Sequence, residues 1–346
     1  MKKNGKSIYD RINEKITTKE FSVQNLISKM KVELICTTDE PTDDLEFHKQ
    51  LQGSRFSKVL PTFRPDKFLV IDKIDFLKNI EKLEEFADIS IENFDNLVDA
   101  LKKRIAFFDQ VGCKLSDHGL NQLFALDASN EELNKILNKR LSNESLSDVE
   151  VQKFQTALLI ALAKEYATKN WTMQLHLGAQ RDNNLRLSNL LGNDVGCDSI
   201  GDFRQAAGLS FLLKTLDFNN ALPKTILYNL NPADNEVFAT MAGNYNDSSI
   251  AGKVQWGSAW WFLDQKDGME KQINTLSNMG LLSKFIGMLT DSRSFMSFPR
   301  HEYFRRIVCD ILGAQIEKGQ LPNDIEWIGK MASNISYHNA KNYFKF

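Results

Sequence analysis

The stretch TILYNL at residues 225–230 decides the fold. It is a short apolar run, rich in β-branched and aromatic side chains, and it ends at Asn231 and Pro232. Such side chains favour a strand, and the Asn-Pro pair predicts a turn directly after it. A helix-like stretch separates this run from the next one. Because neighbouring parallel strands need a long crossover, usually a helix, this order predicts βαβ units and a parallel sheet.

The same pattern recurs along the whole chain. The stretches between the runs have apolar side chains at the i, i+3, i+4 spacing of an amphipathic helix, as at Leu77, Ile80 and Leu83. An open doubly wound sheet and a closed barrel are both built from such units. The predicted strands are residues 32–36, 59–63, 113–115, 173–177, 225–230, 254–257 and 285–289.

Seven units are many for one doubly wound sheet and one short of a barrel. We therefore expect an α/β fold, a (β/α)8 TIM-type barrel that is incomplete, with seven strand–helix units and the first strand missing. The expected domain organisation is a single, N-terminally truncated barrel domain over residues 1–346, in which the longer connections hold helical insertions.

Composition excludes several classes of protein. The formal net charge of −2 and the absence of a polybasic block argue against binding to nucleic acid. No apolar run approaches the roughly 18 residues of a membrane-spanning helix, and no signal-peptide pattern follows the basic start. The four cysteines show no CxxC spacing, which fits a reducing compartment. We expect a cytoplasmic protein with neither a membrane nor a nucleic-acid partner.

Polar side chains gather where the predicted strands end, which is where a barrel has its active site. Each has a structural alternative: Asp39 and Asp291 could cap helices, His176 could be a hydrogen-bonded core histidine, and Trp260 could be core packing. Charged or imidazole groups at five or more strand ends favour a functional site instead. These candidates are Asp39, Arg64, His118, His176, Trp260, Asp291 and Arg293.

Common catalytic motifs are absent from the sequence. It has no GxxxxGK[ST] phosphate loop, no GxGxxG after a strand and no GxSxG elbow. His301 and Glu302 begin an HExxH pattern, but Arg305 stands at its fifth position. The histidines are far apart in sequence, so any metal site must be assembled from separate strands.

Seven longer motifs, in order along the chain, carry a family resemblance. On them the sequence resembles the uronate isomerases (glucuronate isomerase), a branch of the amidohydrolase superfamily, from about Ser7 to the C-terminus. The motifs are CTTDEP at 36–41, FRPD at 63–66, QLHLGAQR at 174–181, LPKTILY at 222–228, GSAWWF at 257–262, LTDSRSF at 289–295 and RHEYFRR at 300–306.

The resemblance implies an aldose–ketose isomerase, an intramolecular oxidoreductase that converts D-glucuronate to D-fructuronate and D-galacturonate to D-tagaturonate. It implies a divalent metal, usually zinc, held by an HxH pair on the first strand and by Asp291. Asp291 and His176 are then the catalytic candidates. Arg64 and Arg293 match the clamps for the sugar carboxylate, and we expect Asp39 and Trp260 to line the same substrate site.

That chemistry suits these residue types. Moving a carbonyl group between C1 and C2 requires removal of a proton beside a carbonyl and stabilisation of an enediolate. Arginine binds a carboxylate through its planar fork. The base is either Asp291 or an activated water; the sequence leaves both open.

The family's first strand, with its HxH pair, has no counterpart in these residues. This agrees with the count of seven units and leaves two main hypotheses. One is a uronate isomerase represented by a shortened chain, whose activity and metal are then in question. The other is a non-catalytic remnant or a sugar-acid-binding paralogue. An amidohydrolase that opens an amide or lactone is a third reading. A sugar acid is the expected partner, and a homo-oligomer is allowed.

Overall fold

The principal sheet is parallel throughout the part of the chain that the computed structural model describes, residues 4–54, 57–289, 291 and 294–346. Two strands form one parallel pair, and four more form a sheet in which each strand pairs with the next along the chain. These strands are β1 (Leu34–Cys36), β2 (Lys58–Leu60), β3 (Leu115–Leu120), β4 (Thr172–Leu177), β7 (Lys224–Asn229) and β8 (Val254–Trp256).

Phe63 joins the two parts of the sheet. It forms parallel bridges to Asp39 on one side and to Ser116 on the other. Its N–H donates to the carbonyl of Leu115 at 3.0 Å, and its carbonyl accepts the N–H of Asp117 at 3.0 Å. The strands therefore follow one another across the molecule in chain order, β1-β2-β3-β4-β7-β8.

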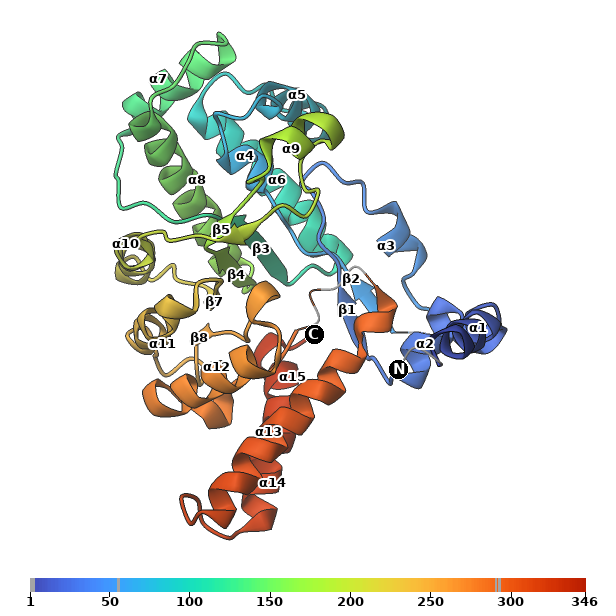
Figure 1. Ribbon diagram of the computed structural model, residues 1–346. Coiled ribbons are helices and arrows are strands. Elements are labelled where there is room, and N and C mark those ends of the chain that lie inside the picture. Colours follow the sequence, from blue (N-terminus) through green and yellow to red (C-terminus); the bar gives the residue numbers. More distant parts are fainter. Residues whose placement is uncertain (1–3, 55–56, 290, 292–293) are drawn as a thin grey trace.

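Helices connect the strands and surround the sheet (Figure 1). A small antiparallel pair, β5 (Ala179–Gln180) and β6 (Ser199–Ile200), stands apart from the parallel sheet. No helix among the described residues is long and apolar enough to cross a membrane. The helices are α1 (Gly5–Ile16), α2 (Val23–Lys29), α3 (Glu46–Gln50), α4 (Asp66–Leu69), α5 (Phe76–Ala87), α6 (Phe94–Val111), α7 (Asn130–Leu141), α8 (Asp148–Thr168), α9 (Leu185–Leu191), α10 (Gln205–Phe218), α11 (Asn235–Gly243), α12 (Lys266–Met279), α13 (Pro299–Glu317), α14 (Ile325–Ser333) and α15 (Asn339–Phe344).

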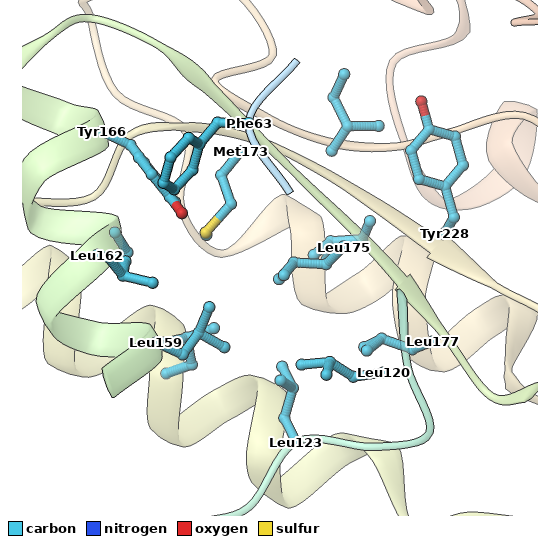
Figure 2. Packing of buried hydrophobic residues seen from close by; sticks show 14 of the residues in the cluster. Phe63, Leu120, Leu123, Leu159, Leu162, Tyr166, Met173, Leu175, Leu177 and Tyr228 are labelled. Carbon is cyan, nitrogen blue, oxygen red and sulfur yellow. The ribbon is translucent and has the colours of Figure 1, made fainter. Parts of the chain in front are cut away.

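Helix α8 packs its buried side chains against those of the sheet (Figure 2). Serine 147 caps its start with a capping box to Glu150, which satisfies N–H groups that the first turn leaves without partners. Apolar side chains from α8 meet those of β4, and each fully buried one contributes about 1.5–3 kcal/mol. The buried side chains labelled there include Leu159, Leu162 and Tyr166 of α8 and Met173, Leu175 and Leu177 of β4.

The expected strand at residues 285–289 is wrong. That segment is irregular and follows a short 3-10 turn, Leu282–Lys284. The side-chain N–H groups of Asn339 donate to the carbonyls of Ser283 and Phe285, so these carbonyls bond a side chain and not a neighbouring strand. Gly287 has φ +78, which breaks an extended conformation. The described residues therefore hold six parallel strands rather than seven.

Two of the other expected strands differ most from the observed ones in their bounds. The expected strand at 113–115 is Leu115–Leu120, because Ser116, Asp117 and His118 continue the strand and are all buried. The expected strand at 59–63 ends at Leu60, and Phe63 pairs beyond it as an isolated bridge.

Phe63→Ala should destabilise the protein by about 3–5 kcal/mol, because Phe63 is fully buried and packs edge-on against Phe108 at 5.1 Å. The free energy of unfolding in urea measures the loss. Phe218→Ala is the matched control: Phe218 is 87% exposed, so its change should stay within about 0.5 kcal/mol. Equal losses for the two variants would contradict the packing described above.

Candidate active site

A row of side chains crosses the sheet near the carboxyl ends of its central strands. Gly119 of β3 pairs with His176 of β4, and His176 pairs with Tyr228 of β7. Side chains at directly opposite positions point to the same face of a sheet. The ring of Tyr228 stacks on the imidazole of His176, with centroids 4.2 Å apart and planes 2° apart. This stacking fixes the plane of the His176 ring.

Gly119 leaves room in that row for Arg64. A Cβ atom placed on Gly119 would lie 2.3 Å from Nη2 of Arg64, closer than atoms can approach. The guanidinium therefore occupies the space that a side chain on β3 would otherwise fill. This places a cation beside His176 although Arg64 follows a different strand.

Asp117 ties Arg64 to His176. It lies two residues before Gly119, on the same face of β3. Its Oδ1 atom is 2.7 Å from Nδ1 of His176, and its Oδ2 atom accepts a hydrogen bond from Nη1 of Arg64 at 3.2 Å. Burial raises the pKa of Asp117, but His176 and Arg64 outweigh it and hold the pKa at about 2. The carboxylate is therefore ionised, and Nδ1 of His176 carries the proton that they share.

Nε2, the second ring nitrogen of His176, takes no part in the contact with Asp117. That atom is buried and has no hydrogen-bond partner among the residues that the structure describes. A carboxylate that fixes one ring nitrogen and leaves the other available is the arrangement that proton-transferring and metal-binding histidines share.

Asp66 holds the other side of Arg64. Its Oδ2 atom accepts hydrogen bonds from Nε of Arg64 at 2.9 Å and from the N–H of Gly119 at 2.8 Å. Burial lowers the pKa of Arg64, but the carboxylates of Asp66 and Asp117 outweigh it and the net pKa is raised. The Arg64 side chain is 34% exposed, so this permanently charged group is fixed by two carboxylates and still reaches solvent.

Asp291 and Trp260 complete the site. The indole Nε1–H of Trp260 donates to Oδ2 of Asp291 at 2.6 Å. The Trp260 ring also lies 4.7 Å from the His176 ring, so the carboxylate of Asp291 and the imidazole of His176 flank one indole. Trp261, directly after it, is a bulky residue with φ +53, a conformation that costs about 1–3 kcal/mol and turns the chain sharply at this point.

The structure brings together four of the predicted site residues: Arg64, His176, Trp260 and Asp291. Arg293 lies outside the described residues. Asp39 meets this group through its backbone, because its carbonyl accepts the N–H of Arg64 at 2.9 Å. Its carboxylate accepts hydrogen bonds from Thr37 and from the N–H of Thr62.

His118 points to the other face of β3 from His176. It contacts Asp66 at 3.3 Å and packs against Tyr166 of α8. Sequence reasoning missed Asp66, Asp117 and Tyr228. Side chains alternate between the two faces of a strand, so the sequence LSDHGL at 115–120 places Asp117 and His118 on opposite faces of β3. That alternation was the signal that could have identified Asp117.

The described residues alone do not fit a catalytic zinc ion. Among them there is no group of three His, Cys, Asp or Glu side chains that could hold a metal ion. On the face of the sheet that carries Arg64, Nε2 of His176 and the carboxylate of Asp291 are the available donors, because Asp66 and Asp117 already bind Arg64 and an imidazole each. Nε2 of His118 also has no partner among the described residues, but His118 points to the other face of β3. A catalytic zinc ion usually has three protein ligands and one open position.

Comparison with known proteins decides the family. A sequence profile described as glucuronate isomerase matches residues 1–344. The chain belongs to the uronate isomerase family. It is 53% identical to a uronate isomerase of Flavobacterium johnsoniae over 345 residues, which cover 99% of this chain and 74% of that protein. It is 52% identical to a uronate isomerase of Caldanaerobacter subterraneus, again over 99% of this chain and 74% of the relative.

A solved uronate isomerase structure has the same fold. The crystal structure from Thermotoga maritima matches with a TM-score of 0.92 at 32% identity, over 99% of this chain and 74% of that one. The uronate isomerase hypothesis is thus confirmed. These relatives give no support to the alternative of a non-catalytic remnant, because each is named as the enzyme.

Gly119→Ala should lower kcat/KM for glucuronate about ten- to a hundredfold, because the new methyl group displaces Arg64 from its place beside Asp117. That range corresponds to the roughly 1.5–3 kcal/mol of one charge-assisted hydrogen bond. Gly313→Ala is the control, since a Cβ there meets nothing within 4 Å. Steady-state kinetics measures both, and parent-like kinetics for Gly119→Ala would contradict the placement of Arg64.

Proposed function

We propose that this uronate isomerase interconverts D-glucuronate with D-fructuronate, and D-galacturonate with D-tagaturonate, at the carboxyl ends of β3, β4 and β7. The observation that carries the proposal is the shared carboxylate of Asp117, which fixes the cation of Arg64 and the imidazole of His176 side by side. A uronic acid offers a carboxylate for the cation and neighbouring oxygens for the imidazole.

The proposed architecture is a single domain over residues 1–346 with an incomplete barrel of the (β/α)8, amidohydrolase kind, of which the described residues hold six parallel strands. Two observations support it. The strands are parallel and follow chain order across the molecule, as they do in such a barrel. Most of the buried apolar side chains of the described residues also belong to one cluster, which includes residues from Leu45 to Tyr343.

Arg64 binds the sugar carboxylate, together with Arg293. Among the described residues, the side-chain hydrogen bonds of Arg64 use its Nε and Nη1 atoms. A substrate carboxylate would meet the Nη2 side of the fork, next to Gly119. Because the two aspartates already hold the guanidinium in place, little side-chain freedom is lost when the substrate binds. Trp260 forms an apolar wall of the same site.

Asp291 and His176 transfer the protons. Asp291 removes the proton from C2 of the open-chain aldose, the C–H electrons form the C1=C2 bond, and the carbonyl electrons move to O1. Nε2 of His176 takes the proton from the C2 hydroxyl and gives it to O1. The enediolate electrons then take the proton of Asp291 at C1, and C2 becomes the carbonyl carbon. Both residues end as they began.

A divalent metal, zinc by the family resemblance, belongs to this proposal as part of the complete family site. Asp291 is the ligand that this chain would supply there, and the metal would polarise the substrate oxygens. None of the steps above passes through it.

The cytoplasm is the proposed location. Cys36, Cys113, Cys197 and Cys309 are all free thiols, which suits a reducing compartment. A homo-oligomer and the lack of a nucleic-acid partner stay predictions from the sequence.

Asp291→Asn should reduce kcat for glucuronate isomerisation by about 10²- to 10⁴-fold, because the amide cannot accept the C2 proton. His176→Gln should also lower kcat, since its amide cannot carry a proton between O2 and O1. Formation of the keto acid, followed by NMR, measures the rates. Asp310→Asn on the exposed face of α13 is the control and should behave as the parent. An Asp291→Asn variant within threefold of the parent would refute the role of Asp291.

A further inference from the structure

A second buried polar cluster lies beside the site, on the connection between β1 and β2. His48 of α3 is 8% exposed, and its Nε2 atom lies 2.8 Å from Oγ1 of Thr37. The same hydroxyl oxygen is 2.6 Å from Oδ2 of Asp39 and 3.3 Å from the carbonyl of Leu60. None of these residues touches the Asp117 carboxylate by a hydrogen bond that the structure shows.

The direction of these hydrogen bonds follows from counting protons. The Thr37 hydroxyl has one proton and two neighbouring acceptors, the carboxylate of Asp39 and the carbonyl of Leu60. The oxygen can therefore only accept from His48, whose Nε2 must carry a proton. The hydroxyl proton goes to Asp39, which at 2.6 Å is the nearer acceptor. The cluster thus runs from His48 through Thr37 to Asp39.

Asp39 in turn holds the backbone that carries Arg64. Its N–H donates to the carbonyl of Thr62 at 2.9 Å, and its own carbonyl accepts the N–H of Arg64 at 2.9 Å. Its side-chain Oδ2 atom accepts the N–H of Thr62 at 3.1 Å. These bonds lie beyond Leu60, where β2 ends. Asp39 therefore holds the segment from Thr62 to Arg64 on the β1 side, while Phe63 pairs with β3 on the other side.

We propose that His48, Thr37 and Asp39 form a positioning cluster for Arg64. The cluster fixes the backbone at Thr62 and thereby aligns the guanidinium with the substrate carboxylate. Asp39 serves the substrate through the backbone rather than by touching it, which replaces its expected role as a substrate-binding residue. The proposal rests on the proposed function of Arg64 as the carboxylate clamp.

A double-mutant cycle separates this role from a merely structural one. His48→Leu removes the donor, whereas His48→Gln keeps an N–H group near the position of Nε2. We expect His48→Leu to raise KM for glucuronate about three- to tenfold with little change in kcat. A change of this kind results when a mutation removes binding energy that the ground state and the transition state share equally. His48→Gln should stay within about twofold of the parent.

The decisive measurement is the change in KM that His48→Leu causes in a protein that already carries Arg64→Ala. There, His48→Leu should change KM no further, because the group that the cluster positions is gone. Thr37→Val, which keeps the shape of the side chain but breaks the link from His48 to Asp39, should repeat the pattern and replaces His48→Leu if that variant does not fold. A KM effect of equal size with and without Arg64, or parent-like kinetics for both variants, would overturn the proposal. If the proposed role of Arg64 in binding the substrate carboxylate is wrong, the Arg64→Ala variant alone will have the KM of the parent.

Discussion

The carboxylate of Asp117 is the interaction on which the rest of the site depends. It is a buried charge, and burying a charge is costly unless partners satisfy it. Its partners are Arg64 and His176, which come from opposite sides of β3. The backbone N–H of the same residue donates to Phe63, the residue that joins the two parts of the sheet. Asp117 therefore takes part both in the pairing that joins the two parts of the sheet and in the hydrogen bonds of the site.

Two glycines give this arrangement its shape. Gly119 leaves the space into which Arg64 reaches, and Gly257 does the same for Tyr228. A Cβ atom on Gly257 would lie 2.2 Å from Cε1 of Tyr228, so the tyrosine could not keep its present position flat against His176. Rigid placement of this kind lowers the reorganisation needed when a substrate binds and reacts. In the same way, His48 and Asp39 are proposed to fix the backbone that carries Arg64.

The sequence predicted the apolar strands well and the polar ones poorly. The run at 225–230 is the strand Lys224–Asn229, because its side chains match the strand pattern whatever surrounds them. Asp117 and His118 could not be assigned in the same way, because β3 is polar in its middle and its length depends on pairing with β4. Residues 285–289 carry a strand-like pattern, but the positive φ of Gly287 and the hydrogen bonds from Asn339 become visible only in the folded structure.

The site residues also differ in whether a local motif was enough to predict their place. Arg64, His176, Trp260 and Asp291 stand in recognisable motifs, and they lie together. Asp39 also stands in such a motif, yet its side chain turns toward Thr62, because buried backbone N–H groups there need an acceptor.

The proton on Nδ1 of His176 is the most direct test of the claim about Asp117. Nitrogen-15 NMR of the histidine side chains at neutral pH reports which ring nitrogen is protonated, and loss of one set of signals in His176→Gln assigns this residue among the five histidines. The account predicts a proton on Nδ1 whose resonance shifts in Asp117→Asn. A His176 ring protonated only at Nε2 would contradict the account.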